Sequence, residues 1–231
     1  MVGRSATEPN PTPSYAYPMR VAVLLLLLAL PTFASDYLTV DETAREVRIE
    51  AVVQPDAMTR WFGVQGHHAI VWTEGRSARW ALFRSLASDH DVRAALDSLG
   101  AKAGENLTIE TWTERENPEH SDPDKRVEGT VVDVFVEWPG SSRVPLSSLI
   151  RQEGMATPAL DFRYGGNEAY QETFHSGCIV CLYSCPGGAV GNHSRTIREY
   201  VNEGVIYFAR SDRLPEDGSR VTLVLVPRGD K

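Results

Sequence analysis

The three cysteines of the chain stand together in one short segment. Cys178, Cys181 and Cys185 fall within eight positions, and His175 stands three residues before the first of them. Their spacing matches the C-x2-C-x2-C-x3-C-P run that holds iron–sulfur clusters in bacterial ferredoxins, with histidine in place of the first cysteine. Two-residue turns let consecutive sulfur atoms converge on one point. The segment therefore predicts a shared centre with Cys178, Cys181, Cys185 and His175 as candidate ligands.

The same residue types are compatible with three kinds of chemistry. An iron–sulfur cluster fits the spacing, and a Cys3His set is also typical of structural zinc. In an oxidising compartment, Cys178 can instead pair with Cys181 or with Cys185, which leaves one thiol over. We therefore expect an iron–sulfur cluster or zinc as the cofactor, and none if the cysteines are oxidised. The segment lacks the C-x-x-C-H pattern of covalent haem.

Residues 1–34 are predicted to be a signal peptide region. Met19 is followed by one arginine and an apolar run over residues 21–30, and small residues precede a cleavage point after Ala34. Met19 is also a candidate for the true start, because the residues before it are proline-rich and aperiodic. The apolar run is too short to span a membrane. We expect export, a periplasmic or secreted location, no stable membrane span after cleavage, and a single domain over residues 35–231.

The formal net charge of −8 argues against nucleic acid and anionic membrane surfaces as partners, since both attract clustered basic residues. The sequence contains no G-x-S-x-G, phosphate-loop, dinucleotide or H-E-x-x-H motif. Hydrolase, nucleotide-binding and metalloprotease functions therefore lack support. Whether the protein is an enzyme is left open, with a non-enzymatic role favoured.

The remaining elements are predicted from the periodicity of apolar residues. Strands are expected at 47–54, 61–72, 75–83, 106–115, 127–138 and 214–227, with helical spacing also compatible at 75–83. Short helices are expected at 88–100, with Ser88 or Asp89 as cap, and at 194–204, with Ser194 as cap. Residues 154–191 are aperiodic. The pattern predicts an α+β fold, with a mixed or antiparallel sheet, a few short helices and a long ordered loop that contains the cysteines.

Two further sets of residues are candidates for a site. His67 and His68 are adjacent, so on a strand they face opposite sides, and we expect at most one of them to line a pocket near the cysteine loop. Arginine and asparagine side chains flank the loop, where salt bridging is the commoner role and anion binding the alternative: Arg163, Asn167, Arg195 and Arg198. The five tryptophans are expected to belong mainly to the core: Trp61, Trp72, Trp80, Trp112 and Trp138.

Several segments together resemble the YdjY-domain family of bacterial exported proteins. They are RYGGN, SGCIVCLYSCPGG, VGNHSRTIREY and LPEDGSRV, joined to the earlier GHHAIVW and ALDSLGAKAG. The resemblance covers roughly residues 47–227, so residues 35–231 are expected to form one YdjY-like domain. Members of the family are described as ferredoxin-like because of the cysteine run, which implies Cys178, Cys181 and Cys185 as cluster ligands.

These features give two functional hypotheses. In the first, an exported protein uses its cysteine loop for metal or iron–sulfur binding or for thiol redox chemistry, as an accessory to an envelope electron-transfer or assembly system. Its partner would then be an envelope redox or assembly protein. In the second, the protein is a non-catalytic interaction module whose loop is held by a disulfide. Thiol and metal stoichiometry separates the two.

Overall fold

A computed structural model describes the chain except for residues 2, 4–35, 60–65, 156, 203 and 230–231. Contacts within the chain divide it into Met1–Thr32 and Phe33–Lys231. Apart from Met1 and Gly3, the predicted signal peptide lies outside the described residues. Within the described residues, none of the helices has the length and apolar character needed to cross a membrane.

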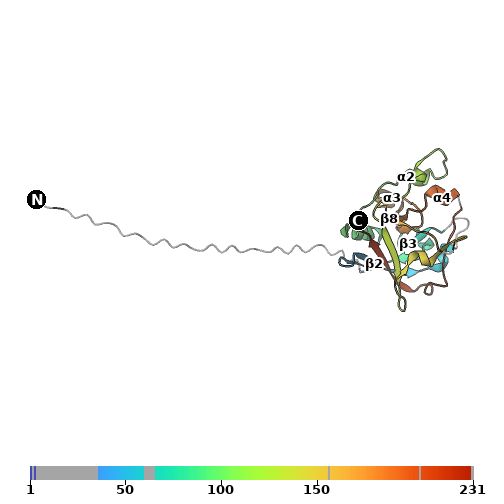
Figure 1. The fold of residues 1–231 in the computed structure, drawn as a ribbon, viewed down its shortest axis with the longest axis horizontal. Helices are drawn as coiled ribbons and strands as arrows, with labels where there is room; N and C mark the ends of the chain where they lie inside the picture. The colour runs from blue at the N-terminus through green and yellow to red at the C-terminus, as the bar shows by residue number, and fades with distance from the viewer. Residues whose placement is uncertain (2, 4–35, 60–65, 156, 203, 230–231) are drawn as a thin grey trace. The chain divides into compact units, whose positions relative to one another are not determined.

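Most of the regular structure is β-strand (Figure 1). The strands are β1 (Leu38–Asp41), β2 (Glu46–Val53), β3 (His68–Trp72), β4 (Phe83–Ser85), β5 (Val132–Glu137), β6 (Val144–Pro145), β7 (Ile150–Gln152), β8 (Phe162–Tyr164), β9 (Cys178–Cys181), β10 (Gly188–Asn192), β11 (Tyr207–Ala209) and β12 (Arg220–Pro227). The helices are α1 (Asp89–Ser98), α2 (Ile109–Thr113), α3 (Glu168–Phe174) and α4 (Ile197–Asn202). Short 3-10 turns are η1 (Pro55–Thr59), η2 (Ala78–Trp80), η3 (Asp122–Asp124) and η4 (Leu146–Leu149).

One mixed sheet organises the fold. Among the described residues it has ten strands in the order β6-β5-β12-β2-β4-β3-β9-β10-β8, with β1 added beside β2, while β7 and β11 form a separate pair. The pairs β3–β4 and β9–β10 are parallel, and the other pairs of this sheet are antiparallel. The expected α+β class with a mixed sheet and a few short helices is confirmed in this coarse form, with strand predominating.

The centre of the sheet follows from alternating apolar sequence. In β5, the positions Val132, Val134 and Val136 are buried, and the residues between them are half-buried. On β12, Leu223 lies opposite Ile49 of β2 and Val136 of β5, and all three side chains are fully buried. Burying such a set of branched side chains stabilises the sheet by about 1.5–3 kcal/mol per residue. This part of the fold was predictable from periodicity alone.

The two ends of the sheet approach each other. β8 ends the strand order on one side, yet Arg163 of β8 forms an antiparallel bridge to Val131, the residue directly before β5. The backbone N–H of Tyr164 also donates to the carbonyl of Thr130 at 2.9 Å. The sheet therefore curls until its far strands meet, and this curl brings β9 and β10 over the same core as β2 and β12.

Helix α1 begins where the sequence predicted. Ser88 Oγ accepts a hydrogen bond from the backbone N–H of Asp91, and the Asp91 carboxylate accepts one from the backbone N–H of Ser88. This reciprocal capping box satisfies two otherwise unpaired donors. Gly100 follows the helix with a φ of 77°. The second predicted helix is also present as α4, but its cap is Thr196, which exchanges hydrogen bonds with Glu199, and not Ser194.

Three predicted elements were wrong. Residues 106–115 form helix α2 and not a strand, because Thr108 and Thr111 cap its first turn and override the strand preference of Ile and Thr. Within 75–83, η2 forms at residues 78–80, and Phe83 at the end of the range belongs to a strand, β4. The long cysteine loop is absent, because β8, α3, β9 and β10 divide it into short connections.

Candidate metal centre

Strand β9 places the first two cysteines inside the sheet. It lies between β3 and β10, and Cys178, Cys181 and Cys185 are all buried. Residues three apart on a regular strand face opposite sides, but the pairing of β9 with β3 shifts register twice, between His68 and Ile70 and between Ile70 and Val71. Bulges of this kind re-aim side chains. They allow both thiols of β9 to approach the same point.

The three thiols form one connected group. The Cys181 thiol interacts with the thiols of both Cys178 and Cys185. The backbone N–H of Gly187 donates to Cys185 Sγ at 3.3 Å. A methyl group at Gly188 would come within 3.2 Å of Cys181 Cβ and 3.6 Å of Cys178 Sγ. The glycines that follow Pro186 therefore leave the space in which the sulfur atoms gather.

Burial keeps these thiols protonated when no cation is present. Burial raises the pKa of Cys181 well above 9.0, and the hydrogen bond with the Cys178 thiol raises it further. The hydrogen bond with Cys181, followed by burial, raises the pKa of Cys185 well above the same value. For Cys178, the hydrogen bond with Cys181 lowers the pKa, but burial outweighs it and the pKa is raised. A bound cation would take the place of the thiol protons and would neutralise the thiolate charge that burial otherwise disfavours.

Both neighbouring histidines face the thiols. The imidazoles of His67 and His68 have ring centroids 3.9 Å apart, and their ligand atoms and the Cys181 sulfur all lie within 4.8 Å of one another. The expectation that the two rings point to opposite sides was wrong. His67 precedes β3, which begins at His68, so strand alternation does not separate them. Both histidines line a pocket that Cys178 and Cys185 also line, where at most one histidine was expected.

The environment of the His68 imidazole favours its neutral, ligating form. Burial, and then the charge of His67, hold the pKa of His68 well below 6.5. His68 Nδ1 is buried and has no hydrogen-bond partner among the described residues. The Tyr200 hydroxyl lies 3.4 Å from His67 Nδ1, and the ring of Tyr183 lies 4.8 Å from the ring of His67. An unsatisfied imidazole nitrogen beside a thiol is a typical donor for a soft metal ion.

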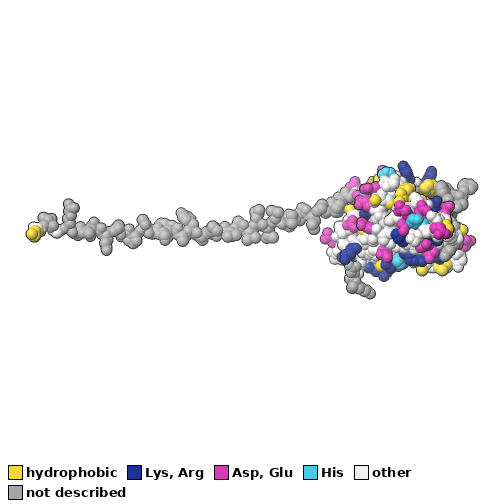
Figure 2. Space-filling view, turned by 90° about the horizontal axis from the view of Figure 1, so that it is seen from above, with side chains coloured by type: hydrophobic (Ala, Val, Ile, Leu, Met, Phe, Trp, Pro, Cys, Tyr) yellow, Lys and Arg dark blue, Asp and Glu magenta, His cyan; other side chains and the backbone are white. Residues whose placement is uncertain are grey.

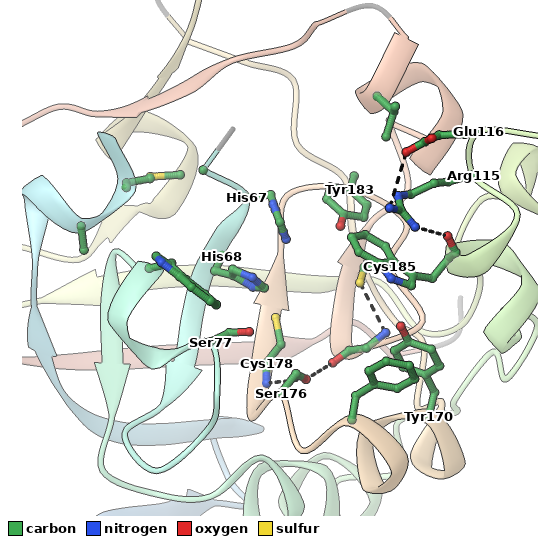
Figure 3. Close-up of a pocket in the computed structure, with 18 residues that line it drawn as sticks. His67, His68, Ser77, Arg115, Glu116, Tyr170, Ser176, Cys178, Tyr183 and Cys185 are labelled. Carbon is green, nitrogen blue, oxygen red and sulfur yellow. Dashed lines mark hydrogen bonds and ion pairs between the residues drawn. The ribbon is translucent and has the colours of Figure 1, made fainter. Parts of the chain in front are cut away.

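The cluster lies at the edge of a pocket of about 530 Å³. Figure 3 shows His67, His68, Cys178 and Cys185 around the same space, with Tyr183 beside His67. The walls are mainly aromatic or apolar: Met58, Trp80, Trp112, Tyr170, Phe174 and Val201. Stacked rings of Tyr170 and Phe174, with centroids 4.3 Å apart, form one side. The centre can therefore meet a small molecule from one direction and is otherwise enclosed.

Other candidates from the sequence lie elsewhere. His175 is exposed at the C-terminal end of α3 with a φ of 49°, and the groups of closely spaced His, Cys, Asp and Glu ligand atoms found in the described residues do not include it. Arg163 pairs with Asp161, and Arg198 pairs with Asp124. Neither arginine lines the pocket.

The tryptophans lie partly in the pocket wall, and a second group of ligand atoms lies on the surface. Trp72, Trp80, Trp112 and Trp138 are half-buried, whereas Trp61 lies outside the described residues. Trp80 and Trp112 contribute to the pocket wall, whereas the tryptophans were expected to belong mainly to the core. His90, Glu168 and Glu172 also lie close together, but on the exposed surface, where such groups are common without an ion.

Comparison with known proteins places the chain in a family. No solved structure matches it. The YdjY domain matches residues 38–226. The chain belongs to the YdjY domain family. The match confirms the resemblance noted in the sequence, and it contains both histidines and all three cysteines.

One curated relative of this YdjY domain is the Uncharacterized protein YdjY of Escherichia coli strain K12, which is 30% identical over 157 residues. The alignment covers 68% of this chain and 65% of the relative. The chain therefore matches just under two thirds of the length of that relative.

Proposed function

We propose that this YdjY domain is an exported metal-binding protein whose centre combines the thiols of Cys178, Cys181 and Cys185 with the imidazoles of His67 and His68. The observation that carries the proposal is the grouping of His67, His68 and Cys181 ligand atoms within 4.8 Å of one another, joined to two further thiols. Two ligands of one zinc ion, each about 2.0–2.3 Å from it, lie within about 4.6 Å of each other. Ligand atoms no more than 4.8 Å apart need only a small approach toward one another to hold one ion.

The type of ion follows from the donor atoms. Thiolates and imidazoles favour zinc, copper(I) and iron over magnesium or calcium, which prefer oxygen ligands. The three thiols are buried, so two of them as thiolates would balance the charge of a divalent ion in a medium of low polarity. Such an ion would act there as a Lewis acid or as an electron carrier, according to its identity. The centre offers five protein donor atoms, three sulfur and two nitrogen. A tetrahedral structural zinc site uses only four.

A [2Fe–2S] cluster is the second candidate, because a cysteine pair together with a histidine pair is a known ligand set for such clusters. The presence of both imidazoles beside the thiols favours it over a cluster held by cysteines alone. The grouping of both imidazoles with the Cys181 sulfur within 4.8 Å favours the single ion, because in such a cluster the cysteine pair and the histidine pair bind different irons.

The location and partner belong to the same proposal. A leader at residues 1–34 would deliver the domain to the periplasm or outside the cell, where an envelope redox or assembly protein is the expected partner. The half-open pocket supports this role, since a centre that exchanges electrons or ions needs one accessible side. A disulfide between two of the cysteines would instead make the domain an interaction module.

Metal and thiol stoichiometry on anaerobically purified protein tests the proposal. We expect about one equivalent of a transition metal and three thiols titrated after denaturation. Cys181→Ser should abolish metal retention, because this thiol contacts both others. His175→Ala tests the alternative imidazole and should retain the metal, because that side chain is exposed. Metal-free protein with only one titratable thiol would overturn the proposal and support the disulfide-held module.

A further inference from the structure

A second cavity, which we call the arginine groove, adjoins the thiol pocket. It has a volume of about 810 Å³, and three arginines line it: Arg76, Arg79 and Arg84. Its wall shares Ser77, Trp80, Phe174 and Ser176 with the thiol pocket. No acidic side chain of the described residues lines it. A protein with a formal net charge of −8 thus gathers basic side chains in one concave place.

These arginines lack the carboxylate partners that the protein supplies elsewhere. Arg143 pairs with Glu46 and with Glu137, and Arg126 pairs with Glu199. On the face drawn in Figure 2, acidic and basic side chains are interspersed. By contrast, none of the groove arginines forms an ion pair with a described residue. Their guanidinium groups are therefore available to an external anion.

Two of the three arginines are held in place by the surrounding structure. Arg84 lies on β4 between Val52 of β2 and Val71 of β3, so two strands fix its backbone. Its Nε is buried and has no hydrogen-bond partner among the described residues, a state that is unfavourable for a polar group. Arg79 is stacked on the ring of Trp80, with its guanidinium carbon 4.2 Å from the ring centroid. Stacking fixes the plane of the guanidinium and leaves its N–H donors free to bind.

The third arginine is held by its main chain. The backbone N–H of Arg76 donates to the carbonyl of His175 at 3.0 Å, and that of Ser77 donates to Ser176 at 3.2 Å. These bonds attach the turn before η2 to the segment that leads into β9. The turn that presents Arg76 and Arg79 is therefore anchored to the segment before the cysteines, and the groove is a fixed part of the fold.

We propose that the arginine groove binds a small polyanion, in which two or more carboxylate or phosphate groups engage Arg76, Arg79 and Arg84. Planar guanidinium groups bind both kinds of oxyanion through paired N–H donors. The volume of the groove is that of a small-molecule site, and the overall negative charge disfavours extended polyanions such as nucleic acid. This inference stands apart from the metal centre and requires no metal to be bound.

Isothermal titration calorimetry on the whole mature protein at low ionic strength tests the proposal. The probes are citrate and inorganic pyrophosphate, which separate carboxylate from phosphate chemistry, with acetate as a singly charged reference. We expect at least one of the two polyanions to bind at least about tenfold more tightly than acetate, because several charge-assisted hydrogen bonds act together. Arg84→Gln and Arg79→Gln should each weaken that binding by about tenfold.

Arg151→Gln is the matched control. Arg151 is an exposed arginine stacked on Phe208, with its guanidinium carbon 4.1 Å from the ring centroid, so its loss removes the same charge and a similar stacking contact outside the groove. Binding should be unchanged in this variant. Arg76→Gln, at an exposed position, provides a second groove variant if Arg84→Gln fails to fold. Absence of binding by both polyanions, or equal weakening in Arg151→Gln and the groove variants, would overturn the proposal.

Discussion

At the scale of single residues, the centre depends on groups that burial holds neutral. Cys181 shows this most clearly, because its raised pKa means that the folded protein retains a proton that the unfolded chain releases near pH 9.0. The thiol therefore contributes stability that is fully present below pH 9.0 and is lost as the pH rises through the folded-state pKa. The same proton must leave before a metal ion can bind.

This linkage gives the first prediction. In metal-free protein, the free energy of unfolding should fall above pH 9.0, and the fall should be shallower in Cys181→Ser, because serine does not titrate there. Urea unfolding at several pH values measures both slopes. The buried tyrosines are present in both proteins, so their effect on the two slopes cancels in the comparison. Identical slopes would show that Cys181 is not buried as a neutral thiol.

His68 gives the second prediction, with the opposite direction in pH. Its pKa lies well below 6.5 in the folded protein, so its contribution to stability is present above pH 6.5 and is lost as the pH falls through the folded-state pKa. Metal-free protein should therefore lose stability below pH 6.5, and His68→Gln should lose less over the same range. Thermal unfolding from pH 7 to pH 5 measures the difference. A steeper loss in His68→Gln would contradict the neutral, buried imidazole.

At the scale of elements, close backbone contacts set the position of the site. Gly177, directly before β9, has a φ of 68°, and a methyl group there would lie 2.6 Å from Gly75 Cα. Gly177→Ala combines an unfavourable left-handed backbone, about 1–2 kcal/mol, with a steric clash of about 1–3 kcal/mol. We expect a total loss of about 2–5 kcal/mol in the free energy of unfolding, together with weaker metal retention.

Gly100→Ala separates the backbone cost from the cost of the steric clash. Gly100 has a φ of 77°, but a methyl group there would meet no atom within 4 Å. The free energy of unfolding of this variant should fall only by the backbone cost, about 1–2 kcal/mol, and the variant should retain its metal. Chemical denaturation and metal analysis of both variants check the prediction. Equal losses in the two would mean that the contact between the segments around Gly75 and Gly177 does not position β9.

The same elements show what the sequence could predict. Strands β2, β5 and β12 and helix α1 were predictable, because one face of each is buried and the sequence shows the matching period. β9 and β10 were not, because every position in them is buried and no alternation remains. The cysteines were recognisable from local spacing. The histidines join them through the pairing of β3 with β9, which connects residues more than a hundred positions apart and leaves no local signal.

At the scale of the whole molecule, the curled sheet makes the centre and the core one unit. The bridge between Arg163 and Val131 joins the last strand of the sheet order to the segment before β5. The buried cluster of apolar side chains includes all three cysteines together with residues of β2, β5 and β12. Unfolding of the sheet should therefore release the metal, and binding of the metal should stabilise the whole domain.

The proposed export has a chemical consequence for the whole molecule. Three thiols held neutral in the core are protected from oxidation while folded, but an exported chain passes through an oxidising space before it folds. Metal capture in that space would then compete with disulfide formation. We expect the full-length protein expressed in a Gram-negative bacterium to appear in the periplasmic fraction with Ser35 as its first residue. N-terminal sequencing and intact mass measurement check this, and a cytoplasmic protein that keeps residues 19–34 would contradict the export proposal while leaving the metal centre to be judged by its own stoichiometry.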